Sequence, residues 1–384
     1  MKIALAHKRL ALSGGTERDF YRTAEGLRDL GHEVHLFCAE LRTAPPGGVV
    51  VHRIAVPPLG RTVRMLAFAF RGPRVVRRHG CDVSISFGRM AWQDVLRSGG
   101  GSHLVFLDKM KVGENFLRRL WHSVSLYHRS LLAVERLQFQ AGNYRQILAV
   151  SAEVKREIVA TYGVPEERVC VIYNGVDDRR FHPRNRETVR AAIKRQWSIP
   201  LDRRLALFVG SGFQRKGLER LLRVWGAERL NDVYLLVVGD DQQIARYRLR
   251  AEREFGGRVV FAGPRENVED YFAAADIFLL PAFQEAFGNV VLEALASGLP
   301  VLVSREVGAS EVLSGAMEEG FLVSPDDPAA VESQIRALLD PSRWSDLSQR
   351  ARKIGERYSW NNHFQELERR LLAVAEQKRR ASKS

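Results

Sequence analysis

Short apolar runs alternate along the chain with longer segments in which apolar residues recur at helical spacing. This alternation is typical of parallel sheets covered by helices, and it occurs in both halves, so we predict an α/β protein with a parallel sheet in each half. In the first half we expect strands near 2–7, 33–38, 49–55, 82–86, 146–150 and 169–172, and helices near 16–30, 62–79, 114–142 and 152–162. In the second half we expect strands near 204–210, 232–239, 258–262, 276–280, 300–303 and 320–323, and helices near 216–229, 242–255, 267–274, 288–298, 308–314 and 328–339.

The length supports a division into two domains. A chain of 384 residues is long for one hydrophobic core, so two domains of about 180 residues each are expected, with the junction after the turn-rich segment 173–177. No apolar run approaches the roughly 18 residues of a membrane-spanning helix, and the first ten residues predict a strand instead of a signal peptide. The widely spaced Cys38, Cys81 and Cys170 lack metal-ligand spacing, which indicates reduced core residues in a cytoplasmic protein.

Positive charge is concentrated in the first half. The net charge is +14; residues 1–172 hold 26 Lys and Arg against 15 Asp and Glu, whereas residues 173–355 hold 26 of each. Two segments, 61–78 and 116–129, interleave arginine with Met, Phe or Trp, which suits either an interfacial segment on anionic lipid or a solvated helix face packed on a sheet. An anionic membrane surface is therefore an expected partner. Nucleic acid is not expected, because no helix-turn-helix, zinc-finger or RNA-binding signature accompanies the charge.

The stretch 281–300 is the most informative about function, because Glu285 and Glu293 are separated there by seven residues. The pattern predicts a strand, a loop with Glu285, and a buried helix with Glu293 about two turns inside it. The free N–H groups at the start of this helix belong to Phe287, Gly288 and Asn289. Such groups bind anions, and a carboxylate beside them favours a nucleotide sugar as the ligand. Alternatively, both glutamates only complement the helix dipole.

Two glycine-rich turns accompany this stretch. The first, with Gly14 and Gly15, follows the first strand of the chain, and the second, with Arg215 and Lys216, follows the first strand of the second half. Glycine lets the backbone approach a pyrophosphate closely, and the adjacent cations supply positive charge. Each turn alone is unspecific, since most α/β proteins contain similar ones.

Together these motifs resemble the retaining glycosyltransferases of family 4, which have the GT-B architecture, two facing Rossmann-like domains with the active site in the cleft between them. The resemblance runs from the first strand to about Trp360 and is sharpest in segments 14–20, 209–217 and 275–285. Within the family it points to the enzymes that add glucose to the inner-core heptose of lipopolysaccharide, because these carry an aspartate at the position of Asp19. Phe287 departs from that pattern, since those enzymes have a small residue there.

The resemblance implies a retaining hexosyltransferase that moves glucose from UDP-glucose to a lipopolysaccharide inner-core heptose. The enzyme would be cytoplasmic and peripheral on the inner face of the cytoplasmic membrane, with a lipid-linked saccharide as acceptor. Residues 1–175 would bind the acceptor and residues 176–357 the nucleotide sugar. A final helix at about 358–377 would pack back on the first domain, and residues 378–384 would form a basic tail.

The resemblance also implies residue roles. Arg215 and Lys216 would neutralise the leaving β-phosphate, so neither a metal nor another cofactor is expected, and no Asp-x-Asp metal motif is present at the donor site. Glu285 would hold sugar hydroxyls and Glu293 the ribose. The expected catalytic residues are Asp19, Glu285, Lys216 and His103. The expected nucleotide-sugar-binding residues are Gly14, Gly15, Arg179, Arg215, Lys216, Arg265, Glu285, Phe287, Gly288, Asn289 and Glu293.

Several of these assignments have alternatives. Arg180 can serve as well as Arg179, Arg265 can be a surface cation, Asp19 can complement a helix dipole, and His103 can be a structural donor. At the level of the protein, the alternatives are a family 4 enzyme that uses another nucleotide sugar, a nucleotide-sugar epimerase, and a non-catalytic membrane-associated protein on the same scaffold.

Overall fold

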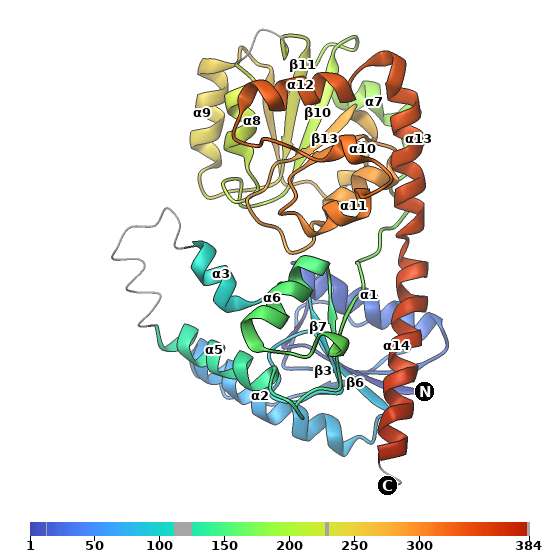
Figure 1. Cartoon of the computed structure of the whole chain (residues 1–384). Helices are drawn as coiled ribbons and strands as arrows, with labels where there is room; N and C mark the ends of the chain where they lie inside the picture. Colours follow the sequence, from blue (N-terminus) through green and yellow to red (C-terminus); the bar gives the residue numbers. More distant parts are fainter. Residues whose placement is uncertain (13, 111–124, 227–229, 382–384) are drawn as a thin grey trace. The chain divides into compact units, whose positions relative to one another are not determined.

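The computed structural model describes residues 1–12, 14–110, 125–226 and 230–381, which form two compact units (Figure 1). Unit 1 comprises Met1–Asn174 and His363–Ser384, and unit 2 comprises Gly175–Asn362. Each unit contains a parallel sheet covered by helices. Among the described residues, no helix combines the length and the apolarity needed to cross a bilayer.

Unit 1 is built on a seven-stranded parallel sheet with the order β5-β3-β1-β6-β7-β8-β9. Its strands are β1 (Lys2–Ala6), β3 (Glu33–Cys38), β5 (Val50–Arg53), β6 (Val83–Ser86), β7 (Val95–Ser98), β8 (Gln146–Ala149) and β9 (Val169–Val171). A two-stranded parallel sheet, β2 (Arg9–Leu10) with β4 (Glu40–Leu41), follows the ends of β1 and β3. β1 pairs with β3 on one side and with β6 on the other, so the chain reverses its direction across the sheet between β1 and β6.

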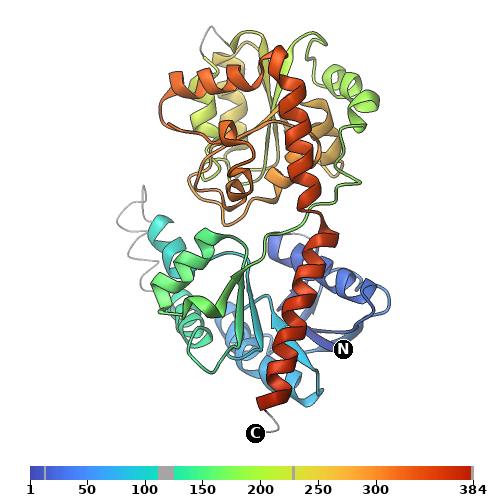
Figure 2. The same ribbon diagram turned by 45° about the vertical axis from the view of Figure 1, so that its right-hand side comes forward.

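Helices cover both faces of this sheet (Figure 2). They are α1 (Gly15–Asp29), α2 (Arg61–Arg78), α3 (His103–Met110), α5 (Leu126–Gln138), α6 (Ala152–Tyr162), the 3-10 helix η1 (Glu166–Arg168) and α14 (Trp360–Ala381). Helix α1 buries Phe20 and Leu27 against β1, because apolar residues recur along one of its faces. Helix α14, the last of the chain, adds Leu367 and Leu371 to the same core.

Unit 2 has a five-stranded parallel sheet with the order β12-β11-β10-β13-β14. Its strands are β10 (Arg204–Val209), β11 (Val233–Val238), β12 (Val259–Gly263), β13 (Ile277–Leu280) and β14 (Val301–Val303). Its helices are α7 (Asn185–Gln196), α8 (Leu218–Val224), α9 (Ile244–Glu254), α10 (Val268–Ala274), α11 (Asn289–Ala296), η3 (Gly308–Leu313), η4 (Glu318–Gly320), α12 (Pro328–Leu338) and α13 (Pro341–Arg357). Helices α12 and α13 each begin with an Asp-Pro pair, in which the carboxylate accepts backbone N–H groups and proline fills the first helical position.

The structure corrects several predicted elements. The strand expected at 320–323 is wrong, because Phe321 forms only an isolated bridge with Val303; this segment is apolar because it is buried in a loop. The helix expected at 308–314 is the 3-10 helix η3, and α8 ends well before residue 229. The helix expected at 114–142 ends at Gln138; its residues 114–124, with Arg118 and Arg119, lie outside the described residues.

The sequence pattern also missed elements. Strand β7 was not predicted because Arg97 interrupts its apolar run, although that arginine is buried. Helices α3, α7 and α13 were missed as well; α7 and α13 are mostly polar and bury only a narrow stripe. The three cysteines are free, with Cys38 and Cys81 buried and Cys170 half-buried at the edge of the core.

Candidate functional site

The carboxyl ends of the unit 2 strands carry most of the predicted donor-binding residues. In this sheet β10 lies between β11 and β13, so the chain reverses direction between β10 and β13. In open α/β sheets, ligands bind at the carboxyl ends of the strands at such a switch point. The turn with Arg215 and Lys216 follows β10, and the loop with Glu285 follows β13. The two loops therefore meet where a ligand is expected.

Glycines allow the turn after β10 to pack tightly. A Cβ atom at Gly210 would lie 2.5 Å from Cδ of Lys216, so the lysine side chain passes directly over this residue. Gly217 has a φ of +78°, and a Cβ atom there would lie 1.9 Å from the carbonyl oxygen of Pro281. A larger residue at Gly217 would force a backbone shift, and one at Gly210 would displace the Lys216 side chain. They hold the Lys216 side chain against the loop after β13.

Glu285 joins both cations of this turn. Nη1 of Arg215 lies 2.8 Å and Nζ of Lys216 lies 3.0 Å from the same carboxylate oxygen, Oε2 of Glu285. The backbone N–H of Glu285 donates to the carbonyl of Glu306 at 3.0 Å, and its own carbonyl accepts from the N–H of Gly308 at 2.9 Å. The three charged groups thus form a fixed ion-pair triad. Sequence reasoning placed them at one ligand but did not foresee that they bind one another.

Electrostatics keep the Glu285 carboxyl ionised. Burial raises its pKa, but Lys216 and Arg215 outweigh this effect and hold the pKa below its ordinary value. Lys216 is buried and Arg215 is half-buried, and the carboxylate lies between the two cations. Two cations that are already in place can therefore bind a diphosphate at this position.

Helix α11 begins directly after this loop. Gly288 is its N-cap, with a φ of +90°, and Asn289 is its first residue. The Phe287 side chain is only 3% exposed, and the Phe287 carbonyl accepts the N–H of Ala309 at 2.7 Å. The bulk of this phenylalanine is thus accommodated inside unit 2. The N-terminus of α11 lies at the same edge of the sheet as the triad.

Glu293 and Arg180 lie close to one another. Nη2 of Arg180 lies 2.6 Å from Oε2 of Glu269 and 2.9 Å from the carbonyl oxygen of Glu266. The hydrogen bond to Glu269, helped by the nearby Glu293, raises the pKa of Arg180. Arg179 is exposed, and its backbone carbonyl accepts a hydrogen bond from a neighbouring arginine. The charge of Glu293 thus acts on Arg180, the alternative to Arg179.

Arg265 follows β12, at the same edge of the sheet. Its Nη2 donates to the carbonyl of Ala262 at 2.7 Å, and its guanidinium lies 5.1 Å from the ring centroid of Trp197. The residue is exposed. It presents a planar cation beside an aromatic ring, at the rim of the sheet edge that holds the triad.

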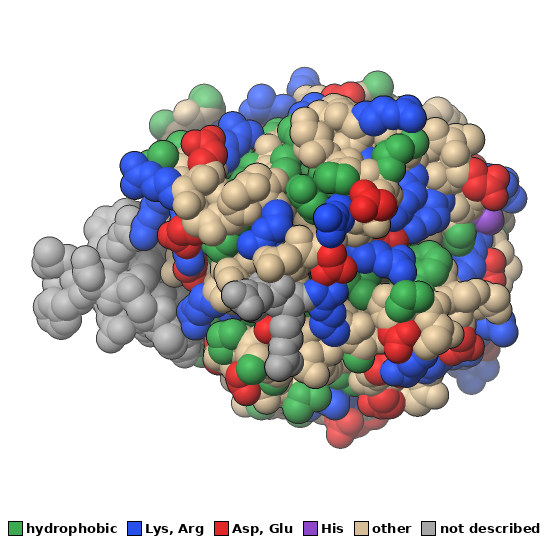
Figure 3. All heavy atoms as spheres, turned by 90° about the horizontal axis from the view of Figure 1, so that it is seen from above, with side chains coloured by type: hydrophobic (Ala, Val, Ile, Leu, Met, Phe, Trp, Pro, Cys, Tyr) green, Lys and Arg blue, Asp and Glu red, His purple; other side chains and the backbone are tan. Residues whose placement is uncertain are grey.

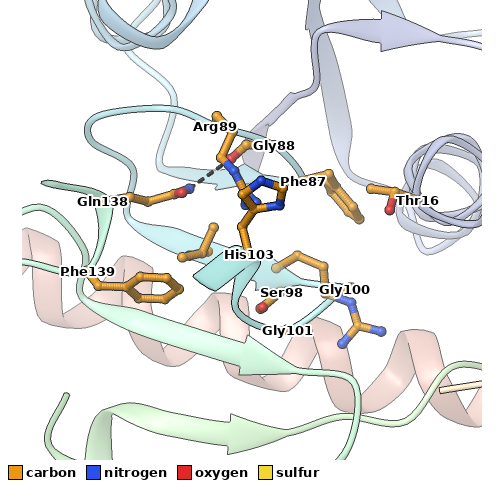
Figure 4. Close-up of a pocket in the computed structure, with 13 residues that line it drawn as sticks. Thr16, Phe87, Gly88, Arg89, Ser98, Gly100, Gly101, His103, Gln138 and Phe139 are labelled. Carbon is orange, nitrogen blue, oxygen red and sulfur yellow. Dashed lines mark hydrogen bonds between the residues drawn. The ribbon is translucent and has the colours of Figure 1, made fainter. Parts of the chain in front are cut away.

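Unit 1 has a cavity of about 190 Å³ at the carboxyl ends of β6 and β7 (Figure 4). Its lining includes the glycine-rich loop 99–101, His103 and Arg89. The amide of Gln138 donates to the carbonyl of Gly88 at 2.8 Å and closes one side. Thr16 of α1 lines the opposite side. The predicted glycine-and-histidine loop therefore forms the wall of a cavity.

His103 is held within this wall by several groups. Its backbone N–H lies 3.1 Å from each carboxylate oxygen of Glu135, and its Nε2 lies 3.1 Å from Nδ1 of His128. Burial, followed by the charges of Arg89 and His128, lowers the pKa of His103 to about 4. The imidazole is therefore neutral at pH 7 and can exchange hydrogen bonds with a sugar hydroxyl.

Asp19 of α1 is a buried residue of unit 1. Its side chain is 6% exposed, and its Oδ2 lies 3.2 Å from Nε of Arg97. Arg97 also donates to the side-chain oxygen of Asn174. Nδ1 of His363 donates to the carbonyl of Tyr173 at 2.7 Å, and both Asp19 and Arg97 act on the pKa of this histidine. Arg97 lines the cavity, so the ion pair with Arg97 connects Asp19 to the cavity wall.

Gly14 and Gly15 belong to unit 1, whereas the other predicted nucleotide-sugar-binding residues belong to unit 2. Gly14 is the N-cap of α1. A Cβ atom at Gly14 would lie 2.5 Å from Oε2 of Glu17, so a carboxylate of the chain itself lies over this turn. Among the described residues, no group of three or more His, Cys, Asp or Glu side chains is arranged to hold a metal ion.

Sequence reasoning missed two arginines of unit 1. Arg97 fixes Asp19, and Arg89 forms an ion pair of 3.1 Å with the buried Glu135 while lining the cavity. A signal for the first was available, since a lone arginine between Val95 and Ser98 is costly in a buried strand unless it is paired. No comparable signal exists for Arg89, which lies in an irregular loop.

Comparisons with known proteins agree with this geometry. The model of "Glycosyltransferase Family 4" matches residues 13–180, and that of "Glycosyl transferases group 1" matches residues 203–341. Lipopolysaccharide glucosyltransferase WaaG of Escherichia coli K12 is 26% identical over 332 residues, which cover 86% of this chain and 87% of that protein.

Solved structures show the same fold. A crystal structure of WaaG covers 96% of this chain and 99% of its own, with a TM-score of 0.78 and 24% identity. The structure of Anabaena HepE in complex with UDP-glucose covers 97% of this chain and all of its own, with a TM-score of 0.71 and 18% identity. The predicted GT-B fold class, with two Rossmann-like parallel sheets, is thereby confirmed. With one family model on each sheet and a similar glycosyltransferase along most of its length, the chain belongs to the glycosyltransferases of family 4.

Proposed function

We propose that this enzyme transfers a hexose, glucose from UDP-glucose, to a heptose of the lipopolysaccharide inner core with retention of configuration. Similarity to a lipopolysaccharide glucosyltransferase over 86% of the chain supports the acceptor class, and the fold shared with a UDP-glucose complex supports the donor. The observation that carries the proposal is the ion-pair triad of Arg215, Lys216 and Glu285 at the switch point of unit 2.

The triad suits the chemistry of the leaving group. As the bond from the anomeric carbon to the diphosphate breaks, negative charge develops on the β-phosphate. Arg215 and Lys216 stabilise that charge, and Glu285 keeps them in place and offers its carboxylate to sugar hydroxyls. The N–H groups at the start of α11 bind phosphate or sugar oxygens, Glu293 binds the ribose, and Arg265 with Trp197 lies beside the base.

On the acceptor side, we place the saccharide in the cavity of unit 1. Neutral His103 exchanges a hydrogen bond with the acceptor hydroxyl, and the glycine-rich loop leaves room for a sugar ring. Retention without a covalent intermediate follows from front-face attack, in which the departing phosphate takes the proton of the acceptor hydroxyl. Asp19 acts by orienting Arg97 and is a positioning residue.

Transfer proceeds without a divalent metal in this proposal, because the two cations carry the charge that Mg²⁺ would otherwise neutralise. Turnover in excess EDTA is expected to stay within about twofold of the untreated enzyme, with any stimulation by Mg²⁺ arising from product release. Complete loss on chelation, restored by one divalent ion, would contradict this part of the proposal.

We also propose that unit 1 lies on the anionic inner face of the cytoplasmic membrane. Helix α2 exposes Val63 and Phe70 by 42% and 43%, and four arginines in the second half of the helix are exposed as well. These arginines are Arg71, Arg74, Arg77 and Arg78. An apolar side chain amid cations suits the interface of an anionic bilayer, where each cation contributes about 1 kcal/mol.

A donor screen tests the proposed function. UDP release is measured with UDP-glucose, UDP-galactose and UDP-N-acetylglucosamine, first alone and then with core lipid as acceptor. The expected result is release from UDP-glucose that rises strongly when the acceptor is added. Release of UDP from another donor would show that the enzyme transfers a different sugar. No release from any nucleotide sugar, with the protein folded, would leave a non-catalytic role.

A further inference from the structure

A second cavity in unit 1, of about 240 Å³, lies beside the one that holds His103. It opens at the carboxyl ends of β1 and β6, between which the sheet of unit 1 reverses direction, so it occupies the ligand position of an open α/β sheet. Gly88 and Arg89 line both cavities. The lining of the second consists of His7, Lys8, Arg9, Glu17, Met65, Phe68, Gly88, Arg89, Tyr127 and Leu131.

Cations outnumber carboxylates around this cavity. Lys8, Arg9 and Arg89 line it, and the charges of Arg61 and Arg64 on α2 act on Lys8. Three carboxylates are near these cations. Glu40 pairs with Arg9 and Arg64, Glu135 pairs with Arg89, and Glu17 lies in the wall. Of the described residues named here, five are cations and three are carboxylates.

Lys8 is the lysine that lines this cavity. Among the described residues, no carboxylate lies within ion-pair distance of its ammonium. Burial lowers its pKa, and the positive charges of Arg64, Arg9 and Arg61 lower it further. An anion placed in the cavity would relieve this repulsion and regain the interaction that burial has removed.

Several of the other lining residues are apolar or aromatic. Met65 and Phe68 of α2 and Leu131 of α5 belong to the lining, and the guanidinium of Arg61 lies 4.6 Å from the ring centroid of Tyr127. A volume of about 240 Å³ is below the roughly 300–1,000 Å³ of sites that enclose a whole drug-sized molecule, so the cavity fits one substituent or one sugar unit.

We propose that this cavity binds an oxyanion, a phosphate or a carboxylate, carried by the acceptor. The position rests on the proposed function, because it places the acceptor hydroxyl near His103 and the anionic substituent on Lys8 and Arg9, with Arg89 between them. The enzyme would then select acceptors that bear a negative group next to the sugar that receives the hexose. Neutral saccharides would bind more weakly.

Direct binding of inorganic phosphate tests the site without any assay of transfer. The donor cations also attract phosphate, so the titration uses Lys216→Gln protein, and thermal unfolding is followed at constant ionic strength. Phosphate is expected to raise the unfolding midpoint. Adding Lys8→Gln should weaken the apparent affinity at least fivefold, whereas adding Lys353→Gln, an exposed lysine of unit 2, should leave it unchanged. Equal phosphate binding with and without Lys8→Gln would overturn the proposal, as would the absence of any midpoint shift.

Further arms separate the sources of the anion. Acetate in place of phosphate shows whether the cavity accepts a carboxylate. A Lys8-dependent shift of the unfolding midpoint with either ion supports the site. If neither ion shifts the midpoint more than chloride does, the site is refuted. In the transfer assay at saturating donor, phosphate should raise the KM for the acceptor, and Lys8→Gln should remove that effect. If phosphate competes only with the donor, the acceptor-borne role is wrong. If no transfer occurs at all while Lys8-dependent phosphate binding persists, the proposed function fails and the anion site stands.

Discussion

The two sheets place cations at equivalent switch points but treat their charge differently. In unit 2, Arg215 and Lys216 share one oxygen of Glu285, so the positive charge is partly offset before a ligand arrives. In unit 1, Lys8 lies among arginines and has no such carboxylate among the described residues. The net charges of the two units differ in the same way. Unit 1 holds 32 Lys and Arg against 18 Asp and Glu, whereas unit 2 holds 27 of each. Figure 3 shows the end of the molecule where α12 lies, with cations and anions interspersed.

From this difference we expect the two sites to hold an anion with different strength. In the proposed reaction a nucleoside diphosphate leaves unit 2 after every cycle, and a carboxylate that competes for the same cations would prevent it from binding too tightly. An uncompensated cation cluster instead captures an anion and holds it. The predictions below test this contrast, from the largest expected effect to the smallest.

Lys216→Ala is expected to lower turnover by roughly 10²–10³-fold, the usual effect of removing one group that stabilises transition-state charge. Circular dichroism should show an intact fold, because the side chain lies over a turn and not in the core. Lys353→Ala, at an exposed position of the same unit, serves as the control and should keep full turnover. Near-normal activity of Lys216→Ala would show that the triad does not take part in donor binding or transfer.

Glu285→Gln is expected to separate binding from turnover. Without the carboxylate, Arg215 and Lys216 are free to bind phosphate oxygens, so the affinity for UDP should rise severalfold, while turnover falls by about 10²-fold because the cations and the sugar hydroxyls lose their fixed partner. Isothermal titration of UDP and steady-state rates measure the two effects. Normal turnover with unchanged UDP affinity would show that the triad is only structural.

Acid is expected to destabilise unit 1 through His363. Burial, followed by the charge of Arg97, lowers the pKa of this imidazole to about 4, below its ordinary value of 6.5. Between pH 6.5 and pH 4 the unfolded chain therefore takes up a proton that the folded chain does not, so the contribution to stability is complete above pH 6.5 and is lost as the pH falls. At about 1.4 kcal/mol for each pH unit, the loss reaches about 3 kcal/mol.

Urea denaturation at pH 7.5 and pH 5 measures this effect. His363→Gln should be less stable at pH 7.5 but should show a flatter dependence of the unfolding free energy on pH. Parallel pH profiles for the two proteins would assign the acid sensitivity to other groups.

The smallest effect concerns the membrane. The triple variant Phe70→Ser, Arg74→Gln, Arg78→Gln on α2 should reduce sedimentation with anionic vesicles severalfold, and rising salt should weaken binding of the wild type, because exposed charges are screened within about 8 Å at physiological ionic strength. The matched control is Leu249→Ser, Arg246→Gln, Arg253→Gln on α9 of unit 2, where Leu249 is 48% exposed. If both variants lose vesicle binding equally, or if binding does not depend on vesicle charge, α2 is not the membrane-binding element.

The sequence predicted the fold well where one physical signal dominated. Buried parallel strands such as β10 and β11 are continuous apolar runs, and helix α1 has a clear apolar face, so both kinds of element could be located. Strand β7 could not, because its buried arginine is stabilised by Asp19 and Asn174, which lie 78 and 77 residues away in the chain. Partners at such distances become visible only when the sheet has formed.

The candidate site shows the same limit. Motif reasoning selected Arg215, Lys216 and Glu285, and the strand order explains why their loops meet. It did not show that the three groups bind one another, since a spacing in sequence carries no distance in space. It also passed over Lys8 and Arg9, although residues that directly follow the first strand of a parallel sheet lie where ligands bind.

Helix α14 has a consequence for the synthesis of the chain on the ribosome. The core of unit 1 contains Leu367, Leu371 and Val374, together with residues of β1 and α1 that were made more than 300 positions earlier. Burial of each such side chain is worth roughly 1.5–3 kcal/mol. Unit 2 is one continuous segment, Gly175–Asn362, and can complete its core as soon as it emerges. The second half of the protein is therefore expected to fold first, and the N-terminal half to remain open until the last helix has left the ribosome.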